Sequence, residues 1–338
     1  MNGPGRVADT FRRHPTLWPL SAMVAILLWN VLFTPGFATL EVRGGRLYGA
    51  LVDILQNGAP VMLLAVGMTL VIALAGIDLS VGSVMALAGT VAALAMTGHG
   101  QPAWAAVAAA LGAAMAVGAF NGAMVTGVGL QPIVATLVVL VAGRGIAQAL
   151  TNDQKVRFEA PAFEFLGNGS LLGLPVPIFI AAGAALVAAV ALRKTVLGLY
   201  IEAIGGSARA ARLAGLPVHS VRMLVYTFCA MCAGLAGLIA TAKIKQADVA
   251  NCGLYLELDA ILAVVIGGTS FAGGRPYLAG ALSGAVIMRT LTMMLLMHNI
   301  PTEQTLIVKA VVAMAVCLVQ TAAAARAAGR LLGRERYA

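Results

Sequence analysis

Ten apolar stretches, each close to the length of a membrane-crossing helix, divide this sequence of 338 residues. A helix that spans a bilayer needs about 20 residues, and glycine, proline or charge bounds each stretch. The bilayer offers no hydrogen-bond partner to the backbone, and strands of membrane barrels are only about 9–11 residues long, so we expect helices. The predicted fold is an all-α integral membrane protein with about ten transmembrane helices. The stretches lie at residues 17–34, 51–75, 79–97, 102–126, 131–150, 175–192, 223–243, 257–271, 276–297 and 303–321.

Boundary error leaves this count open between eight and eleven, because the second and third stretches are nearly continuous and the eighth is short. Composition supports the membrane class. Hydrophobic residues make up 60% of the chain and charged residues 10%, against about 25% charged residues in soluble domains. We therefore predict one transmembrane domain at 17–321, with short tails at 1–16 and 322–338, and exclude an ordinary soluble enzyme.

The formal net charge of +9 is explained by insertion topology. If the chain starts in the cytoplasm and crosses ten times, thirteen of the 22 lysines and arginines fall on the cytoplasmic side. Both termini are therefore predicted to be cytoplasmic. No basic stripe with interleaved aromatic residues accompanies the charge, so we expect no nucleic-acid partner.

Two hydrophilic segments interrupt the apolar pattern, an outer loop at 151–174 and an inner loop at 193–222. The inner loop contains the signals of a short helix. Ser207 is a typical N-cap, Gly215 a typical C-terminal residue, and Pro217 prevents continuation.

This short helix is predicted to be apolar on one side and basic on the other. Ala210, Leu213 and Ala214 share one face, while Arg209 and Arg212 project from another. Such a helix suits insertion into a groove on a soluble partner. The alternative is a positively charged loop that lies on lipid headgroups.

A carboxylate and two glycines break a long apolar run in the segment GIDLSVG at 76–82. Asp78 either lines a solute path in a broken helix, or it belongs to a plain turn in which Asp78 or Ser80 caps the next helix. A second glycine-rich break, GGTSFAGG at 267–274, raises the hypothesis of an inverted repeat of five plus five helices. The candidate path residues are Asp78, Ser80, Asn121, Gln131 and Thr136.

The sequence lacks the common motifs for nucleotide binding and for metal-dependent hydrolysis. No lysine follows a glycine, so there is no GK[ST] phosphate loop, and the four histidines form no HExxH motif. We read the four cysteines (Cys229, Cys232, Cys252 and Cys317) as packing residues, because they lie in or beside apolar stretches without paired spacing. The chain is therefore predicted to be neither an enzyme nor a metal or cofactor protein.

Three segments carry a resemblance to the permease subunits of bacterial ABC importers for monosaccharides, the ribose, xylose, arabinose and methyl-galactoside group. These are GMTLVIALAGIDLSVGSVMALAG at 67–89, EAIGGSARAARLAG at 202–215 and LELDAILAVVIGGTSFAGG at 256–274. The resemblance covers nearly the whole chain. Within the group, residues 44–70 and 254–268 look most like permeases of galactofuranose importers.

The resemblance implies a permease in the bacterial inner membrane that pairs with a second permease subunit, a cytoplasmic ABC ATPase and a periplasmic sugar-binding protein. ATP and magnesium would then bind to the ATPase. The short basic helix would be the coupling helix that docks in the ATPase. The residues assigned to this role are Glu202, Gly206, Ser207, Arg209, Ala210, Ala211, Arg212, Leu213 and Gly215.

Two other classes of function fit the residues alone. An ATP-independent sugar facilitator or channel would move solute without an ATPase. A membrane anchor would recruit a soluble protein without moving any solute.

Overall fold

The computed structural model describes residues 17–34, 36–301, 304–312 and 314. The predicted tails at 1–16 and 322–338 lie outside these residues. The chain divides into two units, Met1–Arg289 and Thr290–Ala338. The second unit is described at residues 290–301, 304–312 and 314. The prediction of a single domain at 17–321 stays a prediction.

Helices dominate the described residues, and their positions follow the apolar stretches of the sequence. They are α2 (Leu17–Phe33), α3 (Ala50–Ala73), α4 (Val81–Thr97), α5 (Ala103–Ala123), the π-helix η1 (Met124–Val128), α6 (Pro132–Thr151), α7 (Pro161–Asn168), α8 (Val176–Lys194), α9 (Val196–Gly206), α10 (Ala208–Leu213), α11 (Val218–Ile244), α12 (Leu256–Ile266) and α13 (Leu278–Met297).

Six helical segments in the described part of the chain are long and apolar enough to cross a membrane: α3, α5 with η1, α6, α8, α11 and α13. The predicted second and third stretches are separate helices, since α3 ends at Ala73 and α4 begins at Val81. With 17 and 11 residues, α4 and α12 are shorter than a full crossing. The tenth stretch lies mostly outside the described residues, so the count of ten remains a prediction.

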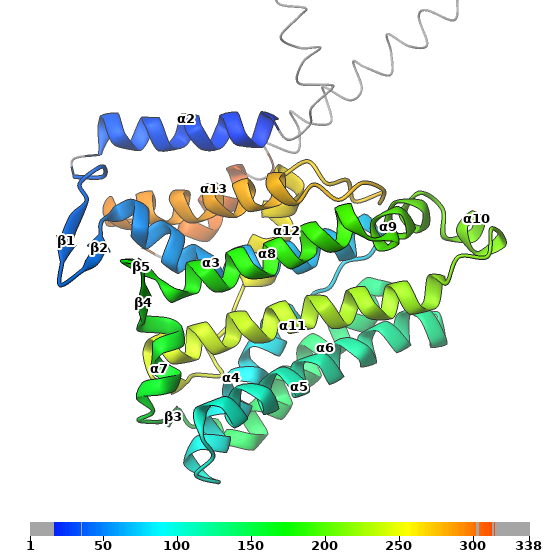
Figure 1. The fold of residues 1–338 in the computed structure, drawn as a ribbon, viewed down its shortest axis with the longest axis horizontal. Coiled ribbons are helices and arrows are strands. Elements are labelled where there is room, and N and C mark those ends of the chain that lie inside the picture. The colour runs from blue at the N-terminus through cyan, green and yellow to red at the C-terminus, as the bar shows by residue number, and fades with distance from the viewer. Residues whose placement is uncertain (1–16, 35, 302–303, 313, 315–338) are drawn as a thin grey trace, which may run out of the picture. The chain divides into compact units, whose positions relative to one another are not determined.

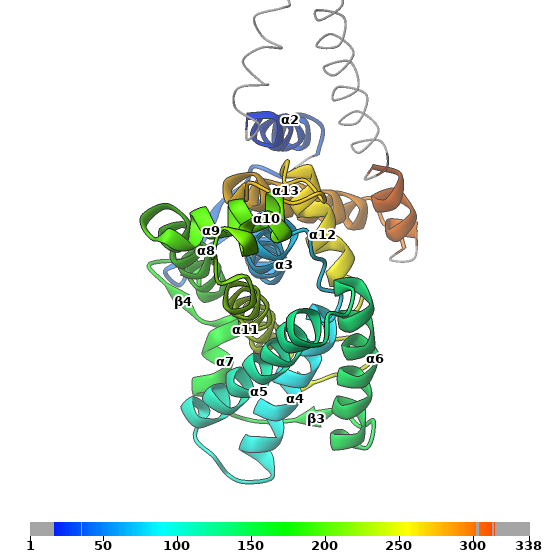
Figure 2. The same ribbon diagram turned by 90° about the vertical axis from the view of Figure 1, so that its right-hand side faces the viewer.

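Helix α3 is the core of the first unit. It packs against α8, α11 and α12, as the view in Figure 2 shows. In its apolar window 78% of the residues are buried, compared with 17% in α8, which turns most of its apolar surface outward. Apolar surface of that extent is expected to face lipid.

Glycines allow α11 to approach its neighbours closely. A Cβ atom on Gly67 of α3 would overlap the backbone of Cys229, and one on Gly237 of α11 would overlap the backbone of Met85 in α4. Small residues at such crossings are the usual means by which membrane helices pack. Cys229 is one of the predicted packing cysteines, and it is buried, as is Cys232.

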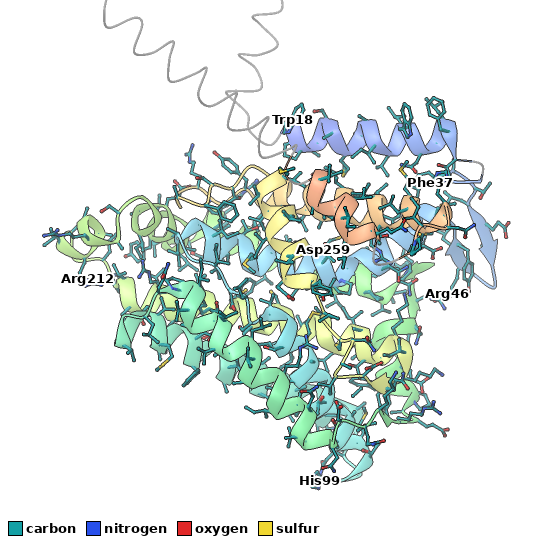
Figure 3. The ribbon with its side chains drawn as sticks, turned by 180° about the vertical axis from the view of Figure 1, so that it is seen from behind. Trp18, Phe37, Arg46, His99, Arg212 and Asp259 are labelled. Atoms are coloured by element: carbon teal, nitrogen blue, oxygen red, sulfur yellow. The ribbon has the colours of Figure 1, made fainter. Side chains whose placement is uncertain are left out.

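The connections between these helices gather at two ends of the first unit (Figure 1). We call one the strand end, because it holds short antiparallel pairs of strands. They are β1 (Glu41–Arg43) with β2 (Arg46–Tyr48), β3 (Val156–Arg157) with β6 (Gln246–Ala247), and β4 (Ser170–Leu171) with β5 (Leu174–Pro175). The other, the α10 end, comprises residues 74–80, 124–131, 195–217 and 267–277. Figure 3 shows Arg212 at the α10 end, opposite Arg46 and His99.

Candidate functional site

The predicted short helix exists as α10, and its two ends are fixed by the residues that the sequence indicated. The Ser207 side chain accepts a hydrogen bond from the backbone N–H of Ala210 at 3.2 Å. At the other end Gly215 adopts a left-handed conformation, with φ of 80°. The backbone N–H of Leu216 donates to the carbonyl of Ala211 at 3.0 Å, which completes a Schellman termination.

Most of α10 and its termination is exposed. Arg209 and Arg212 are both exposed, and the Leu213 side chain keeps 85% of its surface accessible. Ala210 and Ala214 are exposed beside it, whereas Ala211 is buried against the rest of the unit. The predicted apolar face thus lies uncovered next to two cationic side chains.

Helix α9 joins this segment to the core at a close backbone junction. The backbone N–H of Gly274 donates to the carbonyl of Ala73, the last residue of α3, at 2.9 Å. A Cβ atom on Gly205 would overlap both partners of this bond, whereas one on Gly206 would meet nothing within 4 Å. Glu202 pairs with Arg275 at 3.4 Å, but the Arg275 side chain is largely exposed and that of Glu202 is partly exposed. The end of α9 is therefore positioned mainly by glycine and backbone contacts.

The break at 74–80 contains a buried polar network that unites four of the five candidate path residues. Ser80 donates to Asp78 Oδ1 through its backbone N–H at 2.9 Å and through its hydroxyl at 2.6 Å. Asn121 Nδ2 donates to Ser80 Oγ at 2.8 Å, and the Leu79 N–H donates to Thr136 Oγ1 at 3.1 Å. The four side chains that the sequence singled out are fully buried. The network ties the break between α3 and α4 to α5 and α6.

Gln131 does not join this network. It is exposed at the N-terminus of α6, where it lines a hollow of about 720 Å³ together with Arg212, His219 and Arg222. The role of all five residues in a solute path stays a prediction. One contact supports the alternative in which Asp78 belongs to a turn that caps the next helix. Asp78 accepts a hydrogen bond from the backbone N–H of Ser80, the residue before α4.

The two glycine-rich breaks lie side by side in the structure. The backbone N–H of Gly274 donates to the carbonyl of Ala73, which joins the second break to the end of α3 just before the first. The hypothesis that the two breaks are counterparts in an inverted repeat stays a prediction.

Polar residues at the strand end have structural partners that the sequence did not identify. Arg144 of α6 donates to the backbone carbonyls of Val249 at 2.7 Å and Cys252 at 3.3 Å. Glu164 of the outer loop pairs with Lys245 at 2.6 Å. These partners are about 80 to 110 positions away in the sequence, so local patterns gave no signal for them.

A second ion pair fixes the same region. Lys155 Nζ lies 2.8 Å from Asp248 Oδ2, and Asn251 Nδ2 donates to the same oxygen at 3.0 Å. Burial disfavours the charged form of Asp248, but the hydrogen bonds from Lys155 and Asn251 outweigh this cost and lower its pKa. Cys252 lies in this connection as a free thiol, and Cys317 lies outside the described residues.

Comparison with known proteins identifies relatives over most of the chain. The galactofuranose transporter permease protein YtfT of Escherichia coli (strain K12) is 46% identical over 311 residues, or 91% of each chain. The ribose import permease protein RbsC of the same strain is 40% identical, over 89% of this chain and 92% of the relative. The fructose import permease protein FruF of Bifidobacterium longum (strain NCC 2705) is 38% identical, over 90% and 86%.

A family described as "Branched-chain amino acid transport system / permease component" matches residues 50–317, which include every helix from α3 to α13. The apolar helices and the permease relatives together make the chain a multi-pass membrane protein. The expected resemblance to sugar permeases is confirmed. The chain belongs to this family of transport permease components.

Proposed function

We propose that the chain is the transmembrane subunit of an ATP-binding-cassette importer in the bacterial inner membrane and that it moves a monosaccharide inward. Its relatives include permeases named for galactofuranose, ribose and fructose, and galactofuranose is the favoured cargo because YtfT has the highest identity of the three. The chain would cross the membrane about ten times with both termini in the cytoplasm. The α10 end would then face the cytoplasm and the strand end the periplasm.

The observation that carries the proposal is the exposed helix α10. Both ends of the helix are capped, by Ser207 and Gly215. Leu213 is nevertheless 85% exposed to solvent. An apolar side chain flanked by Arg209 and Arg212 is suited to a groove on another protein. We therefore assign α10 as the coupling helix that docks in a cytoplasmic ATPase, with Glu202 and Gly206 on the flanking α9.

The mechanism follows from this placement. ATP would bring the two ATPase subunits together and displace the docked α10 of each permease in a pair. Helix α9 would pass the displacement to α3 through the contact between Gly205 and Ala73, and so to the core of the permease. Alternating access would result, with sugar delivered at the strand end by a periplasmic binding protein. ATP and magnesium would be held by the ATPase.

Reconstitution in proteoliposomes tests this function. We expect uptake of radiolabelled D-galactose, whose solutions contain the furanose form, only when the ATPase, the sugar-binding protein and ATP are all present. Uptake by the permease alone would establish the facilitator instead. Failure of all components together to move D-galactose, D-ribose or D-fructose would overturn the proposal.

A further inference from the structure

A cavity of about 290 Å³ with both polar and apolar walls lies in the first unit, toward the strand end of α3 and α11. Its polar lining includes side chains from α3, α11, the connection before α12, and α13. They are Gln56, Asn57, Thr241, Lys243, Asn251 and Arg289. The cavity also has apolar walls from residues such as Val61 and Ile239. None of the candidate path residues predicted from the sequence lines it.

Two cationic residues stand in this cavity. Lys243 Nζ donates a hydrogen bond to Asn57 Oδ1. The Nε atom of Arg289 is buried and has no hydrogen-bond partner in the structure. A buried donor without a partner costs free energy that a ligand oxygen would recover. Ionisable residues within membrane segments are expensive for folding and most often mark a functional site.

We propose that this cavity holds the monosaccharide during its passage through the permease, which deepens and rests on the proposed importer function. Amide, hydroxyl and cationic side chains supply the donors and acceptors that sugar hydroxyls need, and the apolar walls suit the C–H faces of a sugar ring. The volume is close to the lower end of small-molecule pockets, about 300 Å³, which fits a ligand as small as a monosaccharide. Arg289 would donate to a sugar oxygen.

The charges of the cavity select among ligand classes. Lys243 and Arg289 disfavour a metal cation or an amine. The Asp248 carboxylate also lines the cavity and disfavours a strongly anionic solute. The amide and cationic side chains among the lining residues, with the unpartnered Nε of Arg289, are a poor match for a hydrocarbon chain. A neutral polyhydroxylated solute is the class that remains, and it would enter from the strand end, where a periplasmic binding protein would deliver it.

The first test uses the full importer with its ATPase and binding protein in proteoliposomes, and measures D-galactose uptake per ATP hydrolysed. Ala240 lines the cavity, so Ala240→Phe should fill it, and Arg289→Met should remove a donor. We expect each variant to lower uptake per ATP at least tenfold, while Arg289→Lys retains part of the uptake. Ala109→Phe, on an exposed position of α5, is the matched control and should transport normally. Unchanged uptake per ATP in both cavity variants would overturn the proposal.

A second measurement is independent of transport and of the bulky variants. In the full-length permease with Ala240→Cys, D-galactose should slow the reaction of the new thiol with methyl methanethiosulfonate at least threefold, whereas D-mannitol should protect less. Equal labelling rates with and without D-galactose would also overturn the cavity assignment. If the wild-type importer moved no sugar but the thiol were protected, the importer function would fail while the binding site stood.

Discussion

The strand end and the segment at 195–217 of the α10 end are held by different contacts. At the strand end, side chains hold the connections together: Arg144 binds the carbonyl of Val249, and the pairs Lys155–Asp248 and Lys245–Glu164 bridge two distant loops. In the segment at 195–217, the close backbone contact of Gly205 with Ala73 sets the packing of α9, and Arg209, Arg212 and Leu213 of α10 are exposed.

This difference separates side chains that hold the fold from side chains that do not. The polar bonds of the strand end hold its connections together. The ends of α10 are fixed by Ser207 and Gly215, so Arg209, Arg212 and Leu213 can be changed without loss of a bond that holds this helix. The following predictions separate residues that support the fold from those that serve a partner.

The largest effect is expected from reversing the charge of α10. Arg209→Glu with Arg212→Glu should abolish co-purification of the ATPase and ATP-driven uptake, while membrane insertion and thermal stability stay close to wild type, because both side chains are exposed. Pull-down and proteoliposome uptake measure this. Arg193→Glu with Lys194→Glu removes the same charge from the same end and should retain the ATPase. Normal co-purification of the ATPase with the Arg209/Arg212 variant would remove the coupling assignment and favour a loop that only contacts lipid headgroups. Loss of the ATPase in both pairs would show a general effect of charge rather than a role of α10.

A smaller but strong effect on transport is expected at the buried network. Asp78→Asn should lower uptake more than Glu164→Gln at the strand end, because Asp78 is fully buried and accepts two hydrogen bonds from Ser80. Uptake and melting temperature should be measured together. Loss of uptake at an unchanged melting temperature would support a path role, and a parallel fall would assign Asp78 to the structure of the break. Equal uptake by the two variants would contradict the prediction.

Two adjacent glycines offer a matched test of the junction between α9 and α3. Gly205→Ala should destabilise the protein by about 1–3 kcal/mol, the usual cost of overpacking, because its Cβ would overlap the carbonyl of Ala73. Gly206→Ala should change stability by less than about 0.5 kcal/mol, since its Cβ meets nothing within 4 Å. Thermal unfolding of the purified variants measures both. Equal destabilisation would show that α9 does not pack as described.

The smallest effect concerns the acid response of the strand end. The lowered pKa of Asp248 means that its stabilising contribution is complete above the ordinary aspartate pKa and is lost as the pH falls through the lowered value. Hydrogen exchange in residues 245–255 should therefore rise at acidic pH. Asp248→Asn should raise this exchange already at neutral pH, by an amount consistent with about 1 kcal/mol or less, because Lys155 is largely exposed. A pH-independent exchange rate in the wild type would refute the assignment.

Much of the helix map could be predicted from the sequence, because membrane helices must satisfy their own backbone bonds within one continuous apolar segment. The helix at 208–213 was also predictable, since Ser207, Gly215 and Pro217 act on neighbouring residues. The network of Asp78 with Asn121 was not, although both residues were singled out, because no pattern shows that a residue of α5 meets the break before α4. The partners of Arg144 could not be predicted for the same reason, since they lie more than 100 residues away.

The amino-acid sequence by itself determined the membrane class, the positions of most helices, the capped α10 and the permease family, because each depends on composition or on residues close in the chain. Only the tertiary structure decided that the two glycine-rich breaks lie at the same end, that Gly205 must lack a side chain, and that Asn57, Lys243 and Arg289 surround one cavity. These features depend on the direction and contact of helices far apart in sequence, and packing of the whole unit fixes both.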